Sequence, residues 1–508
     1  MSMALIYSRA NSGIEAVSVT IEAHISNGLP HLAIVGLAET TVKESKDRVR
    51  SALLNSHFEF PVRRVTINLA PADLPKYGGR FDLPIALGIL AASGQIPIQA
   101  LDQYEFAGEL ALNGSLRAIS GVVPFAIATR STGRKLVIPT ENAEEASLVT
   151  GIEILPVKHL LDICAHLKGN PLIIPYSIKA FADIEVSYPD LSEVYGQYNA
   201  KRGLEIAATG CHSLLLMGPP GTGKTLLASR LPSILPDMTE AEALESAAIG
   251  SISIHAFTRS EWRKRPFRAP HHTASNVALV GGGNPPKPGE VSLAHNGILF
   301  LDELPEFSRR TLETLREPLE SGHIVISRAT MQIDFPAKFQ FIAAMNPCPC
   351  GHLGNPHIEC CCSGDQIQRY RARLSGPLLD RIDCHIEVPT VVHEVFNQKK
   401  QGIQETSAVV KKRVEIVREK QLARAGKCNS ELNNQEIKKY CVLSEAEEQL
   451  LQQIVLKLGL SMRSYHRILR IARTIADMGQ SKDIEKEHLC EAISYRLLDR
   501  KRVGSFNE

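Results

Sequence analysis

Aromatic residues and net charge are both scarce in this sequence. Phe, Trp and Tyr make up 5% of the 508 residues, with a single Trp, so base stacking on aromatic rings is not expected to dominate any function. The formal net charge is only +2, which excludes a chain that is basic as a whole. Hydrophobic residues at 44% and charged residues at 22% are typical of a globular protein with several buried cores.

Long uninterrupted hydrophobic runs are also missing. The N-terminal residues lack a basic segment followed by an apolar one, so we expect no export signal. The longest uncharged run, residues 83–101, contains Gly, Ser, Gln and two Pro. Pro84 suits the first turn of a helix, and Pro97 would end that helix short of a bilayer. We expect a buried core helix here, with a membrane span as the less favoured alternative, and a cytoplasmic protein without a membrane partner.

Cysteine is unevenly distributed. The chain has 11 cysteines, an odd number, and five of them lie in "MNPCPCGHLGNPHIECCCSGD" between Met345 and Asp365. Without an export signal the thiols are expected to be reduced, and clustered thiols then indicate a metal more often than a disulfide. Nine residues separate two Cys-x-Cys pairs, which are Cys348, Cys350, Cys360 and Cys362.

These two pairs predict a zinc-binding loop over residues 346–364. Four thiolates satisfy tetrahedral Zn²⁺, and the Pro and Gly between them favour a tight turn that aims the sulfurs inward. His352 and His357 are alternative ligands, and Cys361 is a spare thiol. A redox switch is an alternative, although no activating group is evident nearby. A nucleic-acid contact and an accident of composition are the others.

Four regions of the chain differ in their patterns. Residues 1–166 alternate strands and helices, including two strands around an Asn-Gly turn and a later strand, "KLVIP". Residues 167–190 carry three Pro and no sustained period, so they form the expected linker. Residues 191–400 alternate buried strands with helices, which is typical of a parallel α/β sheet. Residues 401–508 are charged and helical throughout, which predicts a helical domain.

A glycine-rich turn in the third region carries the strongest chemical signal. The stretch "GPPGTGKT" fits the template G-x-x-x-x-G-K-[ST], follows a short apolar strand and opens a helix. Backbone N–H groups of such a loop close around phosphate oxygens, Lys224 reaches the β- and γ-phosphates, and the Thr225 hydroxyl coordinates Mg²⁺. The predicted ATP-binding residues are Gly218, Pro219, Pro220, Gly221, Thr222, Gly223, Lys224 and Thr225.

A pair of acids follows a later strand, "GILFL". Asp302 is expected to complete the Mg²⁺ shell together with Thr225, and Glu303 is placed to activate the attacking water. By itself an apolar run that ends in Asp-Glu is often a strand meeting a surface loop. Its position after a phosphate-binding loop makes the catalytic interpretation the favoured one.

Several further motifs resemble those of a known family. The phosphate loop, the "LDEL" acids and an Asn at the end of the next strand resemble an AAA+ ATPase, while "RPFRAPHHTASNVALVGGG" and "LSGPLLDRID" resemble the magnesium-chelatase-like ComM/YifB family over nearly the whole chain. The resemblance implies an ATP- and Mg²⁺-dependent DNA helicase that works as a hexameric ring in branch migration and natural transformation. It also implies DNA as a partner, branched or single-stranded, and supports zinc at the four cysteines.

The same resemblance implies roles for three residues outside the loop. Asn346 matches the sensor that positions the lytic water, and Arg381 matches the arginine finger that reaches into a neighbouring subunit. Arg463 matches a second sensor on a helical lid. From spacing alone, Arg463 shares a helix face with Arg467 and Arg470, and a solvated charged face is the alternative.

Two features before Asn346 bear on DNA. Residues 324–326 and 331–333 are predicted to pair as a hairpin, which in similar families projects toward the ring pore. The densest basic patch of the region is expected to contact phosphates without sequence preference, or else to be a solvated or subunit-facing surface. It comprises Arg259, Arg263, Lys264, Arg265 and Arg268.

The first region resembles the proteolytic domain of Lon proteases. The turn that carries the Lon nucleophile has Arg80 or Phe81 here, and the helix that carries the Lon lysine has Val123 and Phe125. We therefore expect the Lon-like fold without proteolysis. The predicted fold class is α/β, with a Lon-protease-like α+β N-terminal domain, an AAA+ parallel-sheet P-loop core and a C-terminal helical lid.

Rival functions remain open at this point. A chelatase-type ATPase that remodels a partner protein for metal insertion, without DNA, would use the same phosphate site. A nucleotide-gated scaffold with slow turnover is a third interpretation, and stimulation of ATP hydrolysis by branched DNA would distinguish them.

Overall fold

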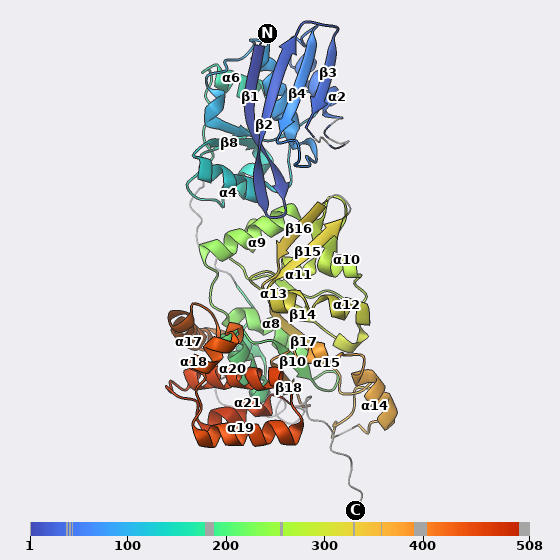
Figure 1. Cartoon of the computed structure of the whole chain (residues 1–508), viewed down its shortest axis with the longest axis vertical. Helices are drawn as coiled ribbons and strands as arrows, with labels where there is room; N and C mark the ends of the chain where they lie inside the picture. Colours follow the sequence, from blue (N-terminus) through green and yellow to red (C-terminus); the bar gives the residue numbers. More distant parts are fainter. Residues whose placement is uncertain are drawn as a thin grey trace, which may run out of the picture.

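The computed structural model describes residues 2–36, 39, 42, 44–177, 187–253, 258–328, 331–356, 358–390 and 404–496. The side chain of Arg259, the alternative ligand His357 and the expected core–lid boundary near residue 400 lie outside the described residues. The chain is elongated, with the N-terminal domain at one end and the C-terminal helices beside the far part of the predicted ATPase core (Figure 1). No described helix is long and apolar enough to cross a membrane.

The N-terminal domain is built on a four-stranded sheet. Alternating burial along the strands sends every second side chain into the core, as the sequence pattern predicts. The strands, in sheet order, are β1 (Ser2–Ser12), β2 (Glu15–Ser26), β4 (Arg64–Ala70) and β3 (His31–Val35), and only the β3–β4 pair is parallel. Helix α2 (Ser45–Asn55) and the fully buried helix α3 (Asp82–Ala92) belong to the same core. The predicted core helix is therefore confirmed.

A second, parallel sheet completes this domain. Strand β8 (Lys135–Pro139) matches the predicted strand "KLVIP" residue for residue and lies between β5 (Tyr104–Phe106) and β9 (Ile154–Val157). The Asn-Gly turn joins the short strands β6 (Glu109–Leu110) and β7 (Leu116–Arg117). Helices α4 (Val122–Thr132), α5 (Ala143–Ala146) and α6 (Leu160–Leu167) follow, and Gly133 ends α4 with a φ of 70°.

The predicted ATPase core is a five-stranded sheet whose described pairs are all parallel. Its strands, in sheet order, are β11 (Phe267–Arg268), β14 (Ile298–Leu301), β17 (Gln340–Met345), β10 (Leu214–Met217) and β18 (Cys384–Glu387). Strands β14 and β17 are buried at every residue, because helices cover both faces of a parallel sheet. The C-terminal ends of β10, β14 and β17 meet at one edge, where ligands bind in open α/β sheets.

Helices surround this sheet. Those that precede and follow the phosphate loop are α7 (Tyr198–Gly210) and α8 (Lys224–Ile234). Further along the core come α9 (Glu240–Ile252), α10 (Asn276–Val280), α11 (Glu290–Leu293), α12 (Arg309–Thr314), α13 (Pro318–Ser321), α14 (Gly364–Arg371) and α15 (Gly376–Leu379). The lid consists of α17 (Ser407–Ala425), α18 (Asn434–Tyr440), α19 (Glu445–Leu458), α20 (Met462–Met478) and α21 (Lys486–Ser494). The predicted fold class is confirmed, whereas the predicted domain boundaries stay predictions.

The predicted hairpin is present as β15 (His323–Arg328) and β16 (Met331–Pro336), paired antiparallel. It lies at the side of the core that faces the N-terminal domain (Figure 1). The turn between β1 and β2 approaches it so closely that a Cβ on Gly13 would lie 3.0 Å from a methyl carbon of Ile333. The hairpin is therefore in contact with the N-terminal domain.

Helix α9 gives the N-terminal domain its second contact with the core. Leu244 and Ala247 of α9 share one hydrophobic cluster with Phe125 of α4, and the half-buried Trp262 packs against the same cluster. The backbone N–H of Gly121 donates to the carbonyl of Ser251 at 2.8 Å. The two domains are thus joined by apolar packing as well as by the chain.

Candidate nucleotide site and cysteine centre

The phosphate loop runs between the end of β10 and the start of α8. Gly221 and Gly223 have φ values of 75° and 86°, which a side chain would disfavour. Gly218 is required for a different reason: a Cβ there would lie 2.2 Å from the carbonyl oxygen of Val388. The glycines of the motif therefore match local backbone needs, and Lys224 is placed at the first residue of the helix.

Lys224 is buried beneath its own loop. Its Nζ donates to the carbonyls of Gly218 and Pro219, both at 2.8 Å, and to Oδ1 of Asn346 at 3.1 Å. Burial lowers the pKa of this amine, while the nearby carboxylates of Asp302 and Glu303 counteract the shift. The structure thus brings the predicted loop lysine and the predicted sensor together.

The predicted Mg²⁺ ligands are also adjacent. Thr225 Oγ1 donates to Asp302 Oδ2 at 2.6 Å, so two oxygens of the kind that Mg²⁺ prefers lie side by side. Glu303 follows with a φ of 51°, and its backbone N–H donates to Asp302 Oδ1 at 2.9 Å. This left-handed backbone turns the Glu303 carboxylate toward the site, where one oxygen lies 3.3 Å from Nδ1 of His272.

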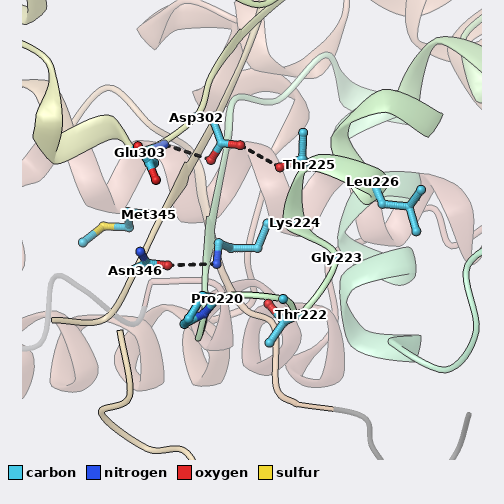
Figure 2. A pocket seen from close by; sticks show the side chains of 11 residues that line it. Pro220, Thr222, Gly223, Lys224, Thr225, Leu226, Asp302, Glu303, Met345 and Asn346 are labelled. Carbon is cyan, nitrogen blue, oxygen red and sulfur yellow. Dashed lines mark hydrogen bonds between the residues drawn. The ribbon is translucent and has the colours of Figure 1, made fainter. Parts of the chain in front are cut away.

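These side chains line one cavity of about 390 Å³ (Figure 2). Its walls come from the phosphate loop, from the acids after β14 and from the end of β17, and they include Met345 and Asn346. Lysine, hydroxyl and carboxylate groups converge on one space, which fits the phosphates of a nucleotide with Mg²⁺.

Two residues at this site were missed by the sequence analysis. Gln197 donates through Nε2 to the carbonyls of Thr222, at 3.2 Å, and Pro389, at 2.8 Å, and so ties the loop to the segment after β18. No sequence pattern signals that contact. His272 contacts Glu303 and lies within the conspicuous "RAPHHTAS" stretch, which was a signal that could have found it.

Arg381 and Arg463 do not line the cavity of their own chain. Arg381 is buried, with Nη2 2.5 Å from Glu320 Oε1 and Nη1 donating to the Pro377 carbonyl at 2.7 Å. Arg463 is 59% exposed and reaches the same Glu320 oxygen at 3.7 Å. The structure therefore brings these two arginines together at Glu320, and their predicted catalytic roles stay predictions.

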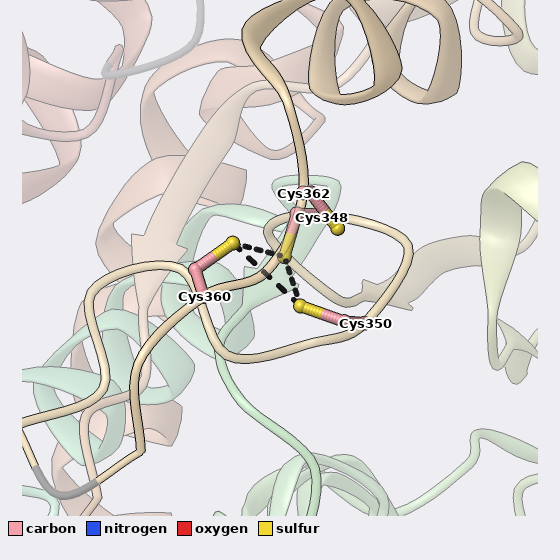
Figure 3. A group of neighbouring side chains, drawn as sticks. All are labelled: Cys348, Cys350, Cys360 and Cys362. Carbon is pink, nitrogen blue, oxygen red and sulfur yellow. Dashed lines mark hydrogen bonds between the residues drawn. The ribbon is translucent and has the colours of Figure 1, made fainter.

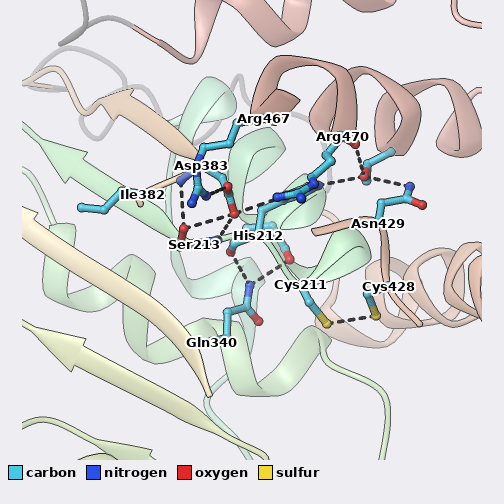
Figure 4. A network of polar contacts seen from close by, with 12 residues as sticks. Cys211, His212, Ser213, Gln340, Ile382, Asp383, Cys428, Asn429, Arg467 and Arg470 are labelled. Carbon is cyan, nitrogen blue, oxygen red and sulfur yellow. Dashed lines mark hydrogen bonds and ion pairs between the residues drawn. The ribbon is translucent and has the colours of Figure 1, made fainter. Parts of the chain in front are cut away.

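The other two arginines of that helix face are not solvated. Arg467 pairs with Asp383 of the core, and Arg470 donates to the carbonyl of Leu432. Both side chains are partly buried contacts at the base of the lid (Figure 4). The solvated-face interpretation is wrong for Arg467 and Arg470, because tertiary contacts that spacing cannot reveal hold them.

The four predicted cysteines form one cluster (Figure 3). Cys348 Sγ lies 3.4 Å from Cys350 Sγ and 3.6 Å from Cys360 Sγ, and the four sulfurs, with that of Cys362, are all within 4.8 Å of one another. Among the described residues no other such group of His, Cys, Asp or Glu occurs. The arrangement fits a tetrahedral thiolate metal site.

Backbone N–H groups donate to two sulfurs of the cluster. The Leu353 N–H points at Cys348 Sγ at 3.4 Å, and a hydrogen bond from the His352 backbone lowers the pKa of Cys350 to about 5. Cys361 is exposed and is not part of the cluster. The cluster also touches the phosphate loop, since a Cβ on Gly351 would lie 2.7 Å from Cδ of Pro220.

The predicted basic patch is divided in the structure. Arg265 is buried and donates to the carbonyls of Pro236 and Asn296, both at 2.7 Å. Arg268 makes a bidentate pair with Glu290. The remaining described members, Arg263 and Lys264, are exposed. The patch is therefore smaller than predicted, because two of its arginines hold the fold together.

The residues at the Lon-like catalytic positions are structural. Arg80 is buried and donates to Asn11 Oδ1 at 2.7 Å and to the Ser120 carbonyl at 2.8 Å. Phe81, Val123 and Phe125 are buried in the domain cores. Packing thus accounts for all four residues that stand where a protease would need a nucleophile and a base.

Comparison with known proteins decides the family. Residues 190–396 match magnesium chelatase subunit ChlI, residues 21–142 match the subunit ChlI family of Mg-chelatase, and residues 404–496 match its C-terminal family. Competence protein ComM of Haemophilus influenzae is 52% identical over 506 residues, which cover 98% of each chain. The chain belongs to the magnesium-chelatase-like ComM/YifB family. The family assignment makes its core a chelatase-like AAA+ ATPase.

Two further relatives cover different shares of the chain. YifB of Escherichia coli is 51% identical over 501 residues, again 98% of each chain. Lon protease 2 of Bacillus subtilis is 27% identical over 181 residues, 33% of this chain and 32% of the relative. The Lon similarity agrees with the fold class predicted for the N-terminal domain.

Proposed function

We propose that this ComM/YifB protein is an ATP-driven DNA motor, a helicase that promotes branch migration of recombination intermediates during natural transformation. In this proposal the chain forms a hexameric ring and hydrolyses ATP at the subunit interfaces. The observation that carries the proposal is the 2.6 Å contact between Thr225 and Asp302 beside a buried loop lysine, since this constellation serves phosphoryl transfer.

Each polar side chain of the cavity would have its own role in ATP hydrolysis. Lys224 would exchange its carbonyl partners for phosphate oxygens, and Asn346, which it already contacts, would orient the attacking water. Glu303 would accept the proton of that water. Thr225 and Asp302 would hold Mg²⁺, which when bound neutralises charge on the phosphates. Each role uses a group that already faces the cavity.

In this proposal, arginines from the neighbouring subunit of the ring supply further positive charge to each ATP site. Arg381 and Arg463 are absent from the lining of their own cavity, which supports a role in a neighbouring subunit's site. The half-exposed Glu320 carboxylate would release Arg381 when the next subunit docks.

The relatives and the exposed basic residues support DNA as the partner. The Haemophilus relative is named a competence protein, and this chain matches it from end to end. Arg263 and Lys264 offer exposed cations next to the core, and such groups bind phosphates without sequence preference. The expected DNA contact is therefore salt-sensitive.

Zinc is the metal proposed for the cysteine cluster. Four sulfurs and a tight turn match structural zinc, which closes its coordination with protein ligands alone. The cluster lies between Asn346 and Arg381 in the chain and touches Pro220 of the phosphate loop. We propose that zinc stiffens this connection and that any contact with DNA is secondary.

An ATPase and unwinding assay on the purified chain tests the motor. We expect branched DNA to stimulate hydrolysis, and Lys224→Ala and Glu303→Gln each to lower turnover by about 100-fold or more. Lys412→Ala is the matched control, because Lys412 is exposed on α17. Unwinding that survives Lys224→Ala would show that the motor proposal is wrong.

A chelatase-type ATPase is the second candidate. The match of residues 190–396 to magnesium chelatase subunit ChlI favours it, and it would remodel a partner protein for metal insertion without DNA. Two results together would support this candidate instead. Branched DNA would not stimulate ATP turnover, and the protein would show no salt-sensitive DNA binding in the presence of ATP.

A further inference from the structure

A second pair of cysteines lies where the ATPase core meets the lid, far in sequence from the zinc loop. The sulfurs of Cys211 and Cys428 are 3.1 Å apart, although 217 residues separate them in the chain (Figure 4). Cys211 follows the last turn of α7 with a φ of 57°, and Cys428 precedes a short 3-10 turn at Asn429–Glu431. The two thiols are therefore held in contact by different domains.

We propose that Cys211 and Cys428 form a peroxide-driven, reversible disulfide that locks the lid onto the ATPase core. Their neighbours suit the chemistry. Cys211 is half-buried, whereas Cys428 is buried. The hydrogen bond between the thiols lowers the pKa of Cys211 to about 6 and raises that of Cys428, so that Cys211 is the thiol that more readily becomes a thiolate. Arg418 adds positive charge to the same place.

A zinc site does not explain this pair. In the described part of the chain, no third His, Cys, Asp or Glu joins these two sulfurs in a ligand group. Two thiols alone do not satisfy the four-coordinate sites that Zn²⁺ occupies in proteins. The other buried thiols differ as well: burial raises the pKa of Cys164 and of Cys441 to about 12, which keeps both protonated.

The reaction balances with hydrogen peroxide as the oxidant. The Cys211 thiolate attacks one peroxide oxygen, so an S–O bond forms as the O–O bond breaks, which leaves Cys211 sulfenic acid and hydroxide. The sulfur of Cys428 then attacks that of Cys211, so an S–S bond forms and the S–O bond breaks. The two thiol protons end in two water molecules. Each sulfur loses one electron, and the peroxide gains two.

Helix α7 would carry the effect to the nucleotide site. Its 13 residues span about 20 Å, from Gln197, which holds the phosphate loop, to Cys211. Along the way its side chains and carbonyls meet the lid: Arg202 pairs with Glu491 at 2.9 Å, and Arg418 donates to the Ala208 carbonyl at 2.8 Å. A covalent bond at the end of α7 would prevent these contacts from separating during a nucleotide cycle.

Peptide mapping of the oxidised full-length protein tests the bond directly. Tryptic cleavage places the two cysteines in separate peptides, residues 203–224 and 428–438, and each peptide has one cysteine. After mild treatment with hydrogen peroxide and alkylation, we expect these peptides to be joined and to separate on reduction. Recovery of both as singly alkylated peptides, or joined to cysteines of the zinc loop, would overturn the proposal.

Stability and turnover give independent readouts. We expect oxidation to raise the melting temperature by about 4 °C or more and to lower ATP turnover about tenfold, with reductant reversing both. Cys211→Ser and Cys428→Ser should each abolish the response, and Cys490→Ser, which removes an exposed lid thiol, should keep it. Serine variants that respond to peroxide like the wild type would overturn the proposal.

The turnover readout rests on the proposed ATPase activity, whereas the peptide map and the melting shift do not. A joined peptide without measurable ATP hydrolysis would leave the disulfide standing and count against the motor. ATP hydrolysis without the joined peptide would overturn the disulfide and leave the proposed motor standing.

Discussion

Asp383 is the residue on which the junction between core and lid depends. It is buried, and its Oδ2 accepts the Ser213 backbone N–H at 3.0 Å, with the Ser213 hydroxyl at 3.1 Å. Its Oδ1 pairs with Arg467 of α20, and His212 Nδ1 lies 3.5 Å from Oδ2 (Figure 4). A single carboxylate thus accepts from the segment just before β10 and from the lid.

Asp383→Asn is expected to destabilise the protein by about 3–5 kcal/mol, because it leaves the partly buried Arg467 without its counter-charge. Urea unfolding would measure this loss. Asp483→Asn, at an exposed position of the lid, is the control and should change the free energy of unfolding by less than about 0.5 kcal/mol.

Asp383 also determines the direction in which the stability of the protein changes with pH. Burial raises the pKa of Asp383, but the Arg467 charge and the hydrogen bonds from His212 and Ser213 outweigh it and hold the pKa below its ordinary value. The stabilisation is therefore fully present above about pH 4 and is lost as the pH falls further. The difference between wild type and Asp383→Asn should be constant from about pH 7 to 5 and shrink below about pH 4; a difference that grows with acid would contradict this.

At the scale of elements, the cysteine loop between β17 and α14 makes the clearest prediction. Purified protein should contain one zinc ion per chain by elemental analysis. Cys348→Ser combined with Cys350→Ser should release it, because two of the four thiolates are lost. Cys361→Ser should keep the metal, since that thiol lies outside the cluster.

Loss of zinc should also uncouple hydrolysis from assembly, because the loop rests on the phosphate loop at Gly351 and Pro220. Gel filtration with a nucleotide analogue would show the altered ring. Unchanged zinc in the double variant would refute the proposed ligand set.

Elements with strong local signals were predictable from the sequence. Strand β8 was predicted residue for residue, and the glycine loop and the hairpin at residues 324–333 were found, because periodicity and turn residues act locally. The roles of Arg265 and Arg268 were not predictable. Both arginines sit in a basic run, and only their distant partners, such as Asn296 and Glu290, turn them into structural contacts.

At the scale of the whole molecule, each ATP site of the proposed ring contains residues from two neighbouring chains. Lys224→Ala and Arg381→Ala should each be inactive alone, because one lacks the loop lysine and the other lacks the finger. Mixed in equal amounts, they should regain about a quarter of wild-type turnover, since about that fraction of interfaces unites an intact loop with an intact finger.

Glu320→Gln is the control for this experiment, because it frees Arg381 from its partner without removing it and should retain activity. A mixture that stays inactive would show that Arg381 does not act across the interface. The sequence alone could not have identified Glu320, since it is 61 positions before Arg381 and no motif joins them.

The half-buried Trp262 gives the molecule a built-in optical reporter. It is the sole tryptophan of the chain, and it packs on the cluster shared by α4 and α9. Indole emission shifts with the polarity of its surroundings, so the intrinsic fluorescence of the unlabelled protein reports whether the N-terminal domain is docked on the core. Nucleotide, DNA and peroxide can each be titrated against that one signal.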